Sequence, residues 1–208
     1  LVTSLAWGLS GRVNYVLEGN LNYTGAVISW LKKDVGLLRT DAESEQLARQ
    51  AHPGDRTYFV PAFTGLGAPY WDSEATGLLT GIPRTTGKAE IVRACLDSIA
   101  YQITDLLECM GRDAALPLAE LRVDGGPTAN RYLMQRQSDL ACLPLAVPAV
   151  QELSALGAAR AAAQGAGLCA CKDFGRPAYT RYQPRMEEAE RRALYGGWQD
   201  AVRRTLYH

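Results

Sequence analysis

The chain has no apolar run long enough to cross a bilayer, no excess of either charge and only two histidines. A membrane-spanning helix needs about 20 consecutive apolar residues, so the sequence excludes a helix of that kind. The 22 basic residues balance the 22 acidic ones, and no cluster of Lys or Arg dominates, which argues against a nucleic-acid partner. The first residues also lack the pattern of a signal peptide. We therefore expect a cytoplasmic protein that binds neither membranes nor nucleic acid.

Cysteine is also scarce, and its count is odd. The five cysteines have no repeated pair spacing, which favours reduced thiols in the cytosol over a disulfide framework. Cys169-Ala-Cys171 has a spacing that could bind a metal, but the only histidines that could complete such a site are His52 and His208. We interpret these cysteines as small, partly buried residues and predict no metal site.

The most informative stretch is Leu121-Arg-Val-Asp-Gly-Gly-Pro-Thr-Ala-Asn130. It is typical of a buried strand that ends at Asp124, followed by a glycine pair and the start of a helix. Pro127 suits a first helical turn, where its missing N–H is not needed. Gly125 and Gly126 would let a ligand approach the backbone closely, and Asn130, one turn into the helix, could hydrogen-bond it. An ordinary β–α turn is the alternative for this stretch taken alone.

The periodicity of apolar residues predicts one α/β domain with a mixed sheet covered by helices on both faces. Strands are expected over 1–7, 12–18, 58–62, 78–82, 121–123 and 144–147, the first two as a hairpin turning at 8–11. Helices are expected over 20–35, 41–51, 88–110, 129–140, 154–166 and 187–207. The loop over 63–73, between the strands expected over 58–62 and 78–82, is rich in Gly, Pro and aromatic residues. Long ordered loops of this kind are often functional.

Two further motifs, taken with the glycine-pair stretch, make the chain resemble a known family. The run Tyr58-Phe-Val-Pro-Ala-Phe-Thr-Gly-Leu-Gly-Ala-Pro-Tyr-Trp-Asp72 and the run Glu152-Leu-Ser-Ala-Leu-Gly-Ala-Ala159 accompany the glycine-pair stretch. Together they resemble the carboxyl-terminal half of the glycerol kinases, within the sugar-kinase family. The resemblance implies a ribonuclease H-like lobe of the actin and hexokinase type. It also implies that residues 1–208 form the carboxyl-terminal, nucleotide-side lobe of a two-lobe kinase, with the amino-terminal lobe and this lobe's first strand outside the chain.

The resemblance implies that ATP lies between the two lobes. It places Gly126 and Asn130 at the adenine and ribose end, with Gly125 in the same turn and Gly25 at a helix start beside the nucleotide. One turn after Gly25 the family has a glutamine, where this chain has Ser29, which is too short to reach the nucleotide directly. Asp124 could act through a metal or brace the turn, and we favour bracing.

The rest of the chain is expected to be structural. Thr64-Gly-Leu-Gly67 lacks the spacing and the lysine of a phosphate-binding loop, so we interpret it as architectural, with Tyr70 and Trp71 as packing residues. No residue here has the family's catalytic context. The base, the glycerol site and the phosphate turn that works with Mg²⁺ are implied in the other lobe or before Leu1.

The predicted function is therefore the ATP-binding lobe of a glycerol kinase, which converts ATP and glycerol to ADP and glycerol 3-phosphate. The lobe alone is expected to be inactive. Two alternatives stay open: a lobe of another polyol or sugar kinase, such as a xylulose or gluconate kinase, and a non-catalytic actin-like module that binds adenosine. The sequence also leaves open a homo-oligomer.

Overall fold

A computed structural model describes residues 1–9, 11–114, 117–150, 152–168 and 178–206. The pair Cys169 and Cys171, with His208, lies outside the described residues. In chain order the elements are β1 (Val2–Leu9), β2 (Arg12–Glu18), α1 (Gly25–Lys33), α2 (Asp41–Gln50), β3 (Tyr58–Val60), β4 (Leu78–Thr80), α3 (Lys88–Ala114), β5 (Leu121–Arg122), the 3₁₀ turn η1 (Gly126–Ala129), α4 (Arg131–Ala141), β6 (Leu145–Pro148), α5 (Leu153–Gly165), β7 (Tyr179–Tyr182) and α6 (Glu188–Leu206).

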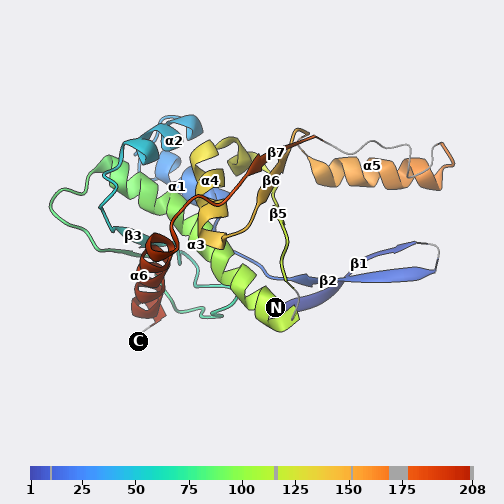
Figure 1. Cartoon of the computed structure of the whole chain (residues 1–208), viewed down its shortest axis with the longest axis horizontal. Coiled ribbons are helices and arrows are strands. Elements are labelled where there is room, and N and C mark those ends of the chain that lie inside the picture. Colours follow the sequence, from blue (N-terminus) through green and yellow to red (C-terminus); the bar gives the residue numbers. More distant parts are fainter. Residues whose placement is uncertain (10, 115–116, 151, 169–177, 207–208) are drawn as a thin grey trace.

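The core forms around α3, the long helix that crosses the body of the molecule (Figure 1). Its central turns are buried, as the apolar stripe predicted, and they contact α2, α4 and β3. Trp198 of α6 is wholly buried and stacks on Tyr101 of α3 with ring centroids 5.2 Å apart. Burying two aromatic side chains against each other adds to the hydrophobic stabilisation of this contact. The terminal helix is therefore part of the core.

The described strands form three small sheets where we expected one. The hairpin β1–β2 is one antiparallel pair, and β3–β4 is another. The third sheet is mixed, because β5 pairs parallel with β6 and β6 pairs antiparallel with β7. Strand β7 was not predicted, since its Tyr-Thr-Arg-Tyr sequence follows a polar stretch and shows little apolar alternation. The Gly125–Gly126 pair lies shortly after β5, the strand that pairs parallel with β6.

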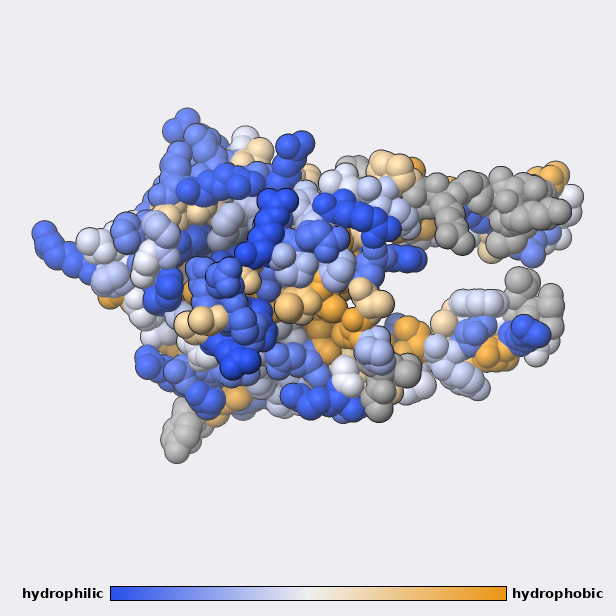
Figure 2. Space-filling view, in the orientation of Figure 1, coloured by the Kyte–Doolittle hydropathy of each residue, from blue (hydrophilic) through white to orange (hydrophobic). Residues whose placement is uncertain are grey.

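Two elements extend away from the body on the same side, the hairpin β1–β2 and helix α5 (Figure 1). Helix α4 packs against β6, as expected for a helix that covers the sheet, and also against β7. By contrast α5, expected to help cover the sheet, has no buried residue. On the hairpin, Leu5 and Tyr15 pair across the strands and each is 69% exposed. The space-filling view shows apolar side chains on this hairpin arm (Figure 2). Among the described helices, none combines the length and apolar character needed to cross a membrane.

Candidate functional site

A cleft of about 780 Å³ opens between α1, α2 and the η1 turn that leads into α4. We call it the α1–α2–η1 cleft. Four of the five residues predicted to bind the nucleotide line it, namely Gly25, Ser29, Gly126 and Asn130. The fifth, Gly125, directly precedes Gly126 and is not itself part of the lining. The fold thus brings two segments about 100 residues apart in sequence to the walls of one cleft.

The turn after β5 requires a glycine at only one of the two positions, Gly125 and Gly126. Gly125 has φ 101° and ψ 171°, a conformation that is essentially restricted to glycine. Gly126 has no left-handed φ, and a Cβ built there would meet no atom within 4 Å. Gly125 is therefore needed by the backbone, whereas Gly126 leaves space in the cleft.

Asp124 braces this turn. Its Oδ1 accepts a hydrogen bond from the Gly125 N–H at 2.8 Å, and its Oδ2 accepts one from the Leu153 N–H at 2.9 Å. The carboxylate thereby ties the turn after β5 to the start of α5. Both oxygens have protein donors, which agrees with the bracing role that we favoured over action through a metal.

Asn130 does not lie one turn into a helix, so that prediction was wrong. The stretch splits into the η1 turn and then α4, and Asn130 is the N-cap between them. Its Oδ1 accepts a hydrogen bond from the Leu133 N–H at 2.9 Å. Asn is among the best N-cap residues because its side chain can accept from a free amide of the first turn. Asn130 as a whole residue is 9% exposed and still borders the cleft.

The opposite wall comes from α1, which begins at Gly25. A Cβ added to Gly25 would lie 3.4 Å from Cγ of Pro127, so α1 and the η1 turn meet closely at this point. Thr24 is the N-cap residue of α1, but its side chain makes no capping hydrogen bond. Ser29 follows one turn later and is half-buried in the lining.

Sequence reasoning missed the third wall, formed by α2. Ser44 and Glu45 line the cleft, and Glu45 Oε2 accepts a hydrogen bond from the Arg131 backbone N–H at 2.9 Å. Partial burial alone would raise the pKa of Glu45, but hydrogen bonds from Arg49 and the Arg131 backbone lower it overall. The carboxylate therefore stays ionised at neutral pH. The short amphipathic pattern of this helix gave no sign of a contact with α4.

The described residues contain no group of three His, Cys, Asp or Glu side chains placed to hold a metal ion.

The Thr64-Gly-Leu-Gly67 run, which we interpreted as architectural, lies in a loop whose backbone is closely packed. Gly65 has φ 80°, and a Cβ there would lie 2.5 Å from the Asp72 carbonyl oxygen. Tyr70 donates a hydrogen bond to the buried carboxylate of Asp105 at 2.8 Å, which fixes the loop to α3. Trp71, also predicted to pack, is instead 62% exposed. The packing interpretation therefore holds for Tyr70 and was wrong for Trp71.

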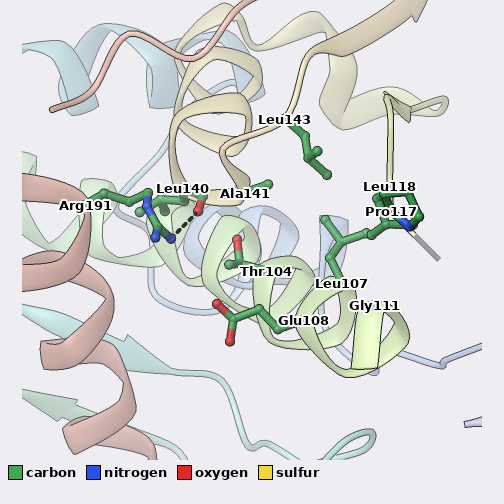
Figure 3. Close-up of a pocket in the computed structure, with 10 residues that line it drawn as sticks. All are labelled: Thr104, Leu107, Glu108, Gly111, Pro117, Leu118, Leu140, Ala141, Leu143 and Arg191. Atoms are coloured by element: carbon green, nitrogen blue, oxygen red, sulfur yellow. Dashed lines mark hydrogen bonds between the residues drawn. The ribbon is translucent and has the colours of Figure 1, made fainter. Parts of the chain in front are cut away.

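A second hollow of about 550 Å³ lies between α3, the end of α4 and α6 (Figure 3). Its walls include Leu107 and Leu143, with Glu108 and Arg191 as charged members. The Arg191 guanidinium contacts the Leu140 carbonyl oxygen at 3.5 Å. None of the predicted nucleotide residues lines this hollow, so the α1–α2–η1 cleft is the candidate site.

Comparison with known proteins gives a consistent set of relatives. Residues 3–166 match the C-terminal domain of the FGGY family of carbohydrate kinases. The chain is similar to the glycerol kinases of Halorhodospira halophila and Geobacillus kaustophilus, with 46% and 43% identity over 209 residues. These alignments cover 99% of this chain but only 41% and 42% of the two relatives.

The structure is similar to a crystal structure of Plasmodium falciparum glycerol kinase with ADP, with a TM-score of 0.89 and 29% sequence identity. That match covers 100% of this chain and 42% of the other. The chain thus spans less than half the length of the relatives it resembles.

Proposed function

This chain belongs to the FGGY family of carbohydrate kinases, as its C-terminal domain, and from that membership we propose that it is the nucleotide-binding lobe of an ATP-dependent glycerol kinase. The membership confirms the expected lobe of the actin and hexokinase type. The complete enzyme would transfer the γ-phosphoryl group of ATP to glycerol, giving ADP and glycerol 3-phosphate. Glycerol, the catalytic base and most phosphate contacts would belong to parts of the protein outside residues 1–208.

One observation carries the proposal. Gly25, Ser29, Gly126 and Asn130, which the resemblance assigned to the nucleotide, line a single cleft of about 780 Å³. Such a volume lies within the usual range for small-molecule sites. The glycerol kinases of Halorhodospira halophila and Geobacillus kaustophilus add support, because they are 46% and 43% identical over almost the whole chain.

The side chains of the cleft suit binding and orientation better than chemistry. Gly126 leaves room for a flat ring or a sugar against the backbone. Asn130 offers an amide, and Ser29 a hydroxyl that could reach the ligand through water. In our proposal this lobe holds the adenosine while closure of the two lobes excludes water from the γ-phosphoryl group. Mg²⁺ would neutralise charge on the phosphates, and we assign none of its ligands to the described residues.

We also propose that the enzyme works in the cytoplasm. Cys95, Cys109 and Cys142 are free thiols, which suits a reducing compartment. A homo-oligomer is compatible with this assignment, and measurement of the mass of the protein in solution tests for it.

A coupled assay of the full-length product of the gene tests the function. The protein is supplied with ATP, Mg²⁺ and glycerol, and ADP release is compared with reactions containing xylulose or gluconate. We expect release that depends on glycerol. Preference for xylulose or gluconate would favour the sugar-kinase alternative. ADP binding without any phosphorylation would favour the non-catalytic module.

A further inference from the structure

The hydrogen bonds around Asn130 leave its side-chain amide only one orientation. The Leu133 N–H lies 2.9 Å from Asn130 Oδ1, and a donor can be met only by the oxygen of the amide. The Nδ2 group must therefore point the other way, toward α2. There it donates to Ser44 Oγ at 3.1 Å.

Ser44 is built to accept that hydrogen bond. Its hydroxyl hydrogen is used, because Ser44 Oγ donates to the Asp41 carbonyl oxygen at 2.5 Å. The hydroxyl oxygen can then act toward Asn130 only as an acceptor. Ser44 is 0% exposed, so water does not compete for its lone pairs. A second hydrogen bond joins the same two helices, because Glu45 of α2 accepts from the backbone N–H of Arg131, the first residue of α4.

One N–H of the Asn130 amide then remains. An asparagine Nδ2 carries two hydrogens, and Ser44 takes one of them. Within the described part of the chain, no acceptor takes the second. Asn130 borders the α1–α2–η1 cleft, so this N–H is the hydrogen-bonding group that the amide can offer to a ligand.

We propose that Ser44 is a positioning residue that holds the Asn130 amide with an N–H toward the cleft, so that the site selects a hydrogen-bond acceptor of the nucleotide. The inference rests on the proposed function, because it takes a nucleotide as the ligand. It adds a residue on α2 that does not itself touch the ligand, and it fixes the polarity of the contact.

Calorimetric titration of ADP into the full-length gene product tests the role of Ser44. Ser44→Ala is expected to weaken binding about two- to tenfold, the range for one lost neutral hydrogen bond. Asn130→Ala should weaken it at least as much. Because Ser44 acts through Asn130, the double variant should bind within about twofold of Asn130→Ala. Losses that multiply, or unchanged binding by Ser44→Ala, would overturn the proposal.

Two further variants separate positioning from general damage. Gln50→Ala changes an exposed side chain of the same helix α2 that does not line the cleft, and it should bind ADP as the wild type does. Asn130→Asp keeps a good helix cap but replaces the offered N–H with an acceptor, and it should bind at least tenfold more weakly.

If the Asn130→Asp variant binds ADP as tightly as the wild type, the Asn130 amide does not donate to the nucleotide. The inference then fails, while the proposed function still stands. If the wild type binds no ADP, the proposed function fails with it. Thermal unfolding of each variant identifies any loss of affinity that comes from unfolding.

Discussion

A methyl group added at Gly125 should destabilise the protein, whereas the same group added at Gly126 should not. The two positions are adjacent in one turn, so Gly125→Ala and Gly126→Ala make a matched pair. At Gly125 the nearest atom to the new Cβ would be Cδ of Pro127 at 4.0 Å. Steric overlap with neighbours is therefore absent among the described residues, and the cost arises from the backbone.

The magnitude follows from the dihedral angles. Gly125 has φ 101° and ψ 171°, and holding a residue with a side chain in that region costs about 1–3 kcal/mol. For a chain of 208 residues, each kcal/mol lowers the melting temperature by about 2–4 °C, so a fall of about 2–12 °C is expected. Gly126 has no left-handed φ and open space at its Cβ, so its variant should stay within about 0.5 kcal/mol of wild type.

Thermal unfolding followed by circular dichroism, at one protein concentration and one heating rate, compares the two variants with wild type. A lower melting temperature for Gly125→Ala alone is the expected result. Equal melting temperatures would show that the turn after β5 relaxes at no cost, and the assignment of a strained glycine there would be wrong.

Four other predictions concern the cleft, the core and the activity. Gly126→Val should raise the KM for ATP far more than that for glycerol, because its methyl groups would enter the cleft; unchanged ATP dependence would make the glycine pair only a turn. Ser29→Gln should tighten ADP binding by up to about tenfold in a titration, and equal or weaker binding would mean that Ser29 does not face the nucleotide. Gly197→Ala should lower the melting temperature, because a Cβ there overlaps Tyr58 Oη, and overpacking costs about 1–3 kcal/mol; Gly196→Ala, which meets nothing within 4 Å, is its control and should not. The 208-residue chain alone should release no ADP in response to glycerol above a tag-only control.

Much of the fold could be predicted from local sequence. The antiparallel hairpin β1–β2, the apolar stripe of α3 and the start of α2 at Asp41 all follow from local sequence patterns. Helix α1 was predicted too long, because the polar residues before Gly25 continue the helical spacing without forming a helix. Strand β7 was missed because its position is set by pairing with β6 and not by a pattern in its own residues.

The site was predicted in part. Gly25, Ser29, Gly126 and Asn130 were chosen from the resemblance, and they line one cleft. The function of the Asn130 side chain as a helix cap was missed, because the 3₁₀ turn before it shifts the helix start by two residues. Ser44 was also missed. Its contact with Asn130 joins residues 86 apart, and nothing in the local pattern of α2 indicates such a pairing.

The most direct test of the account is a crystal structure of the full-length gene product with ADP. We predict electron density for the adenosine in the α1–α2–η1 cleft, against Gly126, with an acceptor atom of the nucleotide within hydrogen-bond distance of Asn130 Nδ2. Density for ADP elsewhere, for example in the hollow between α3 and α6, with this cleft empty, would contradict the account.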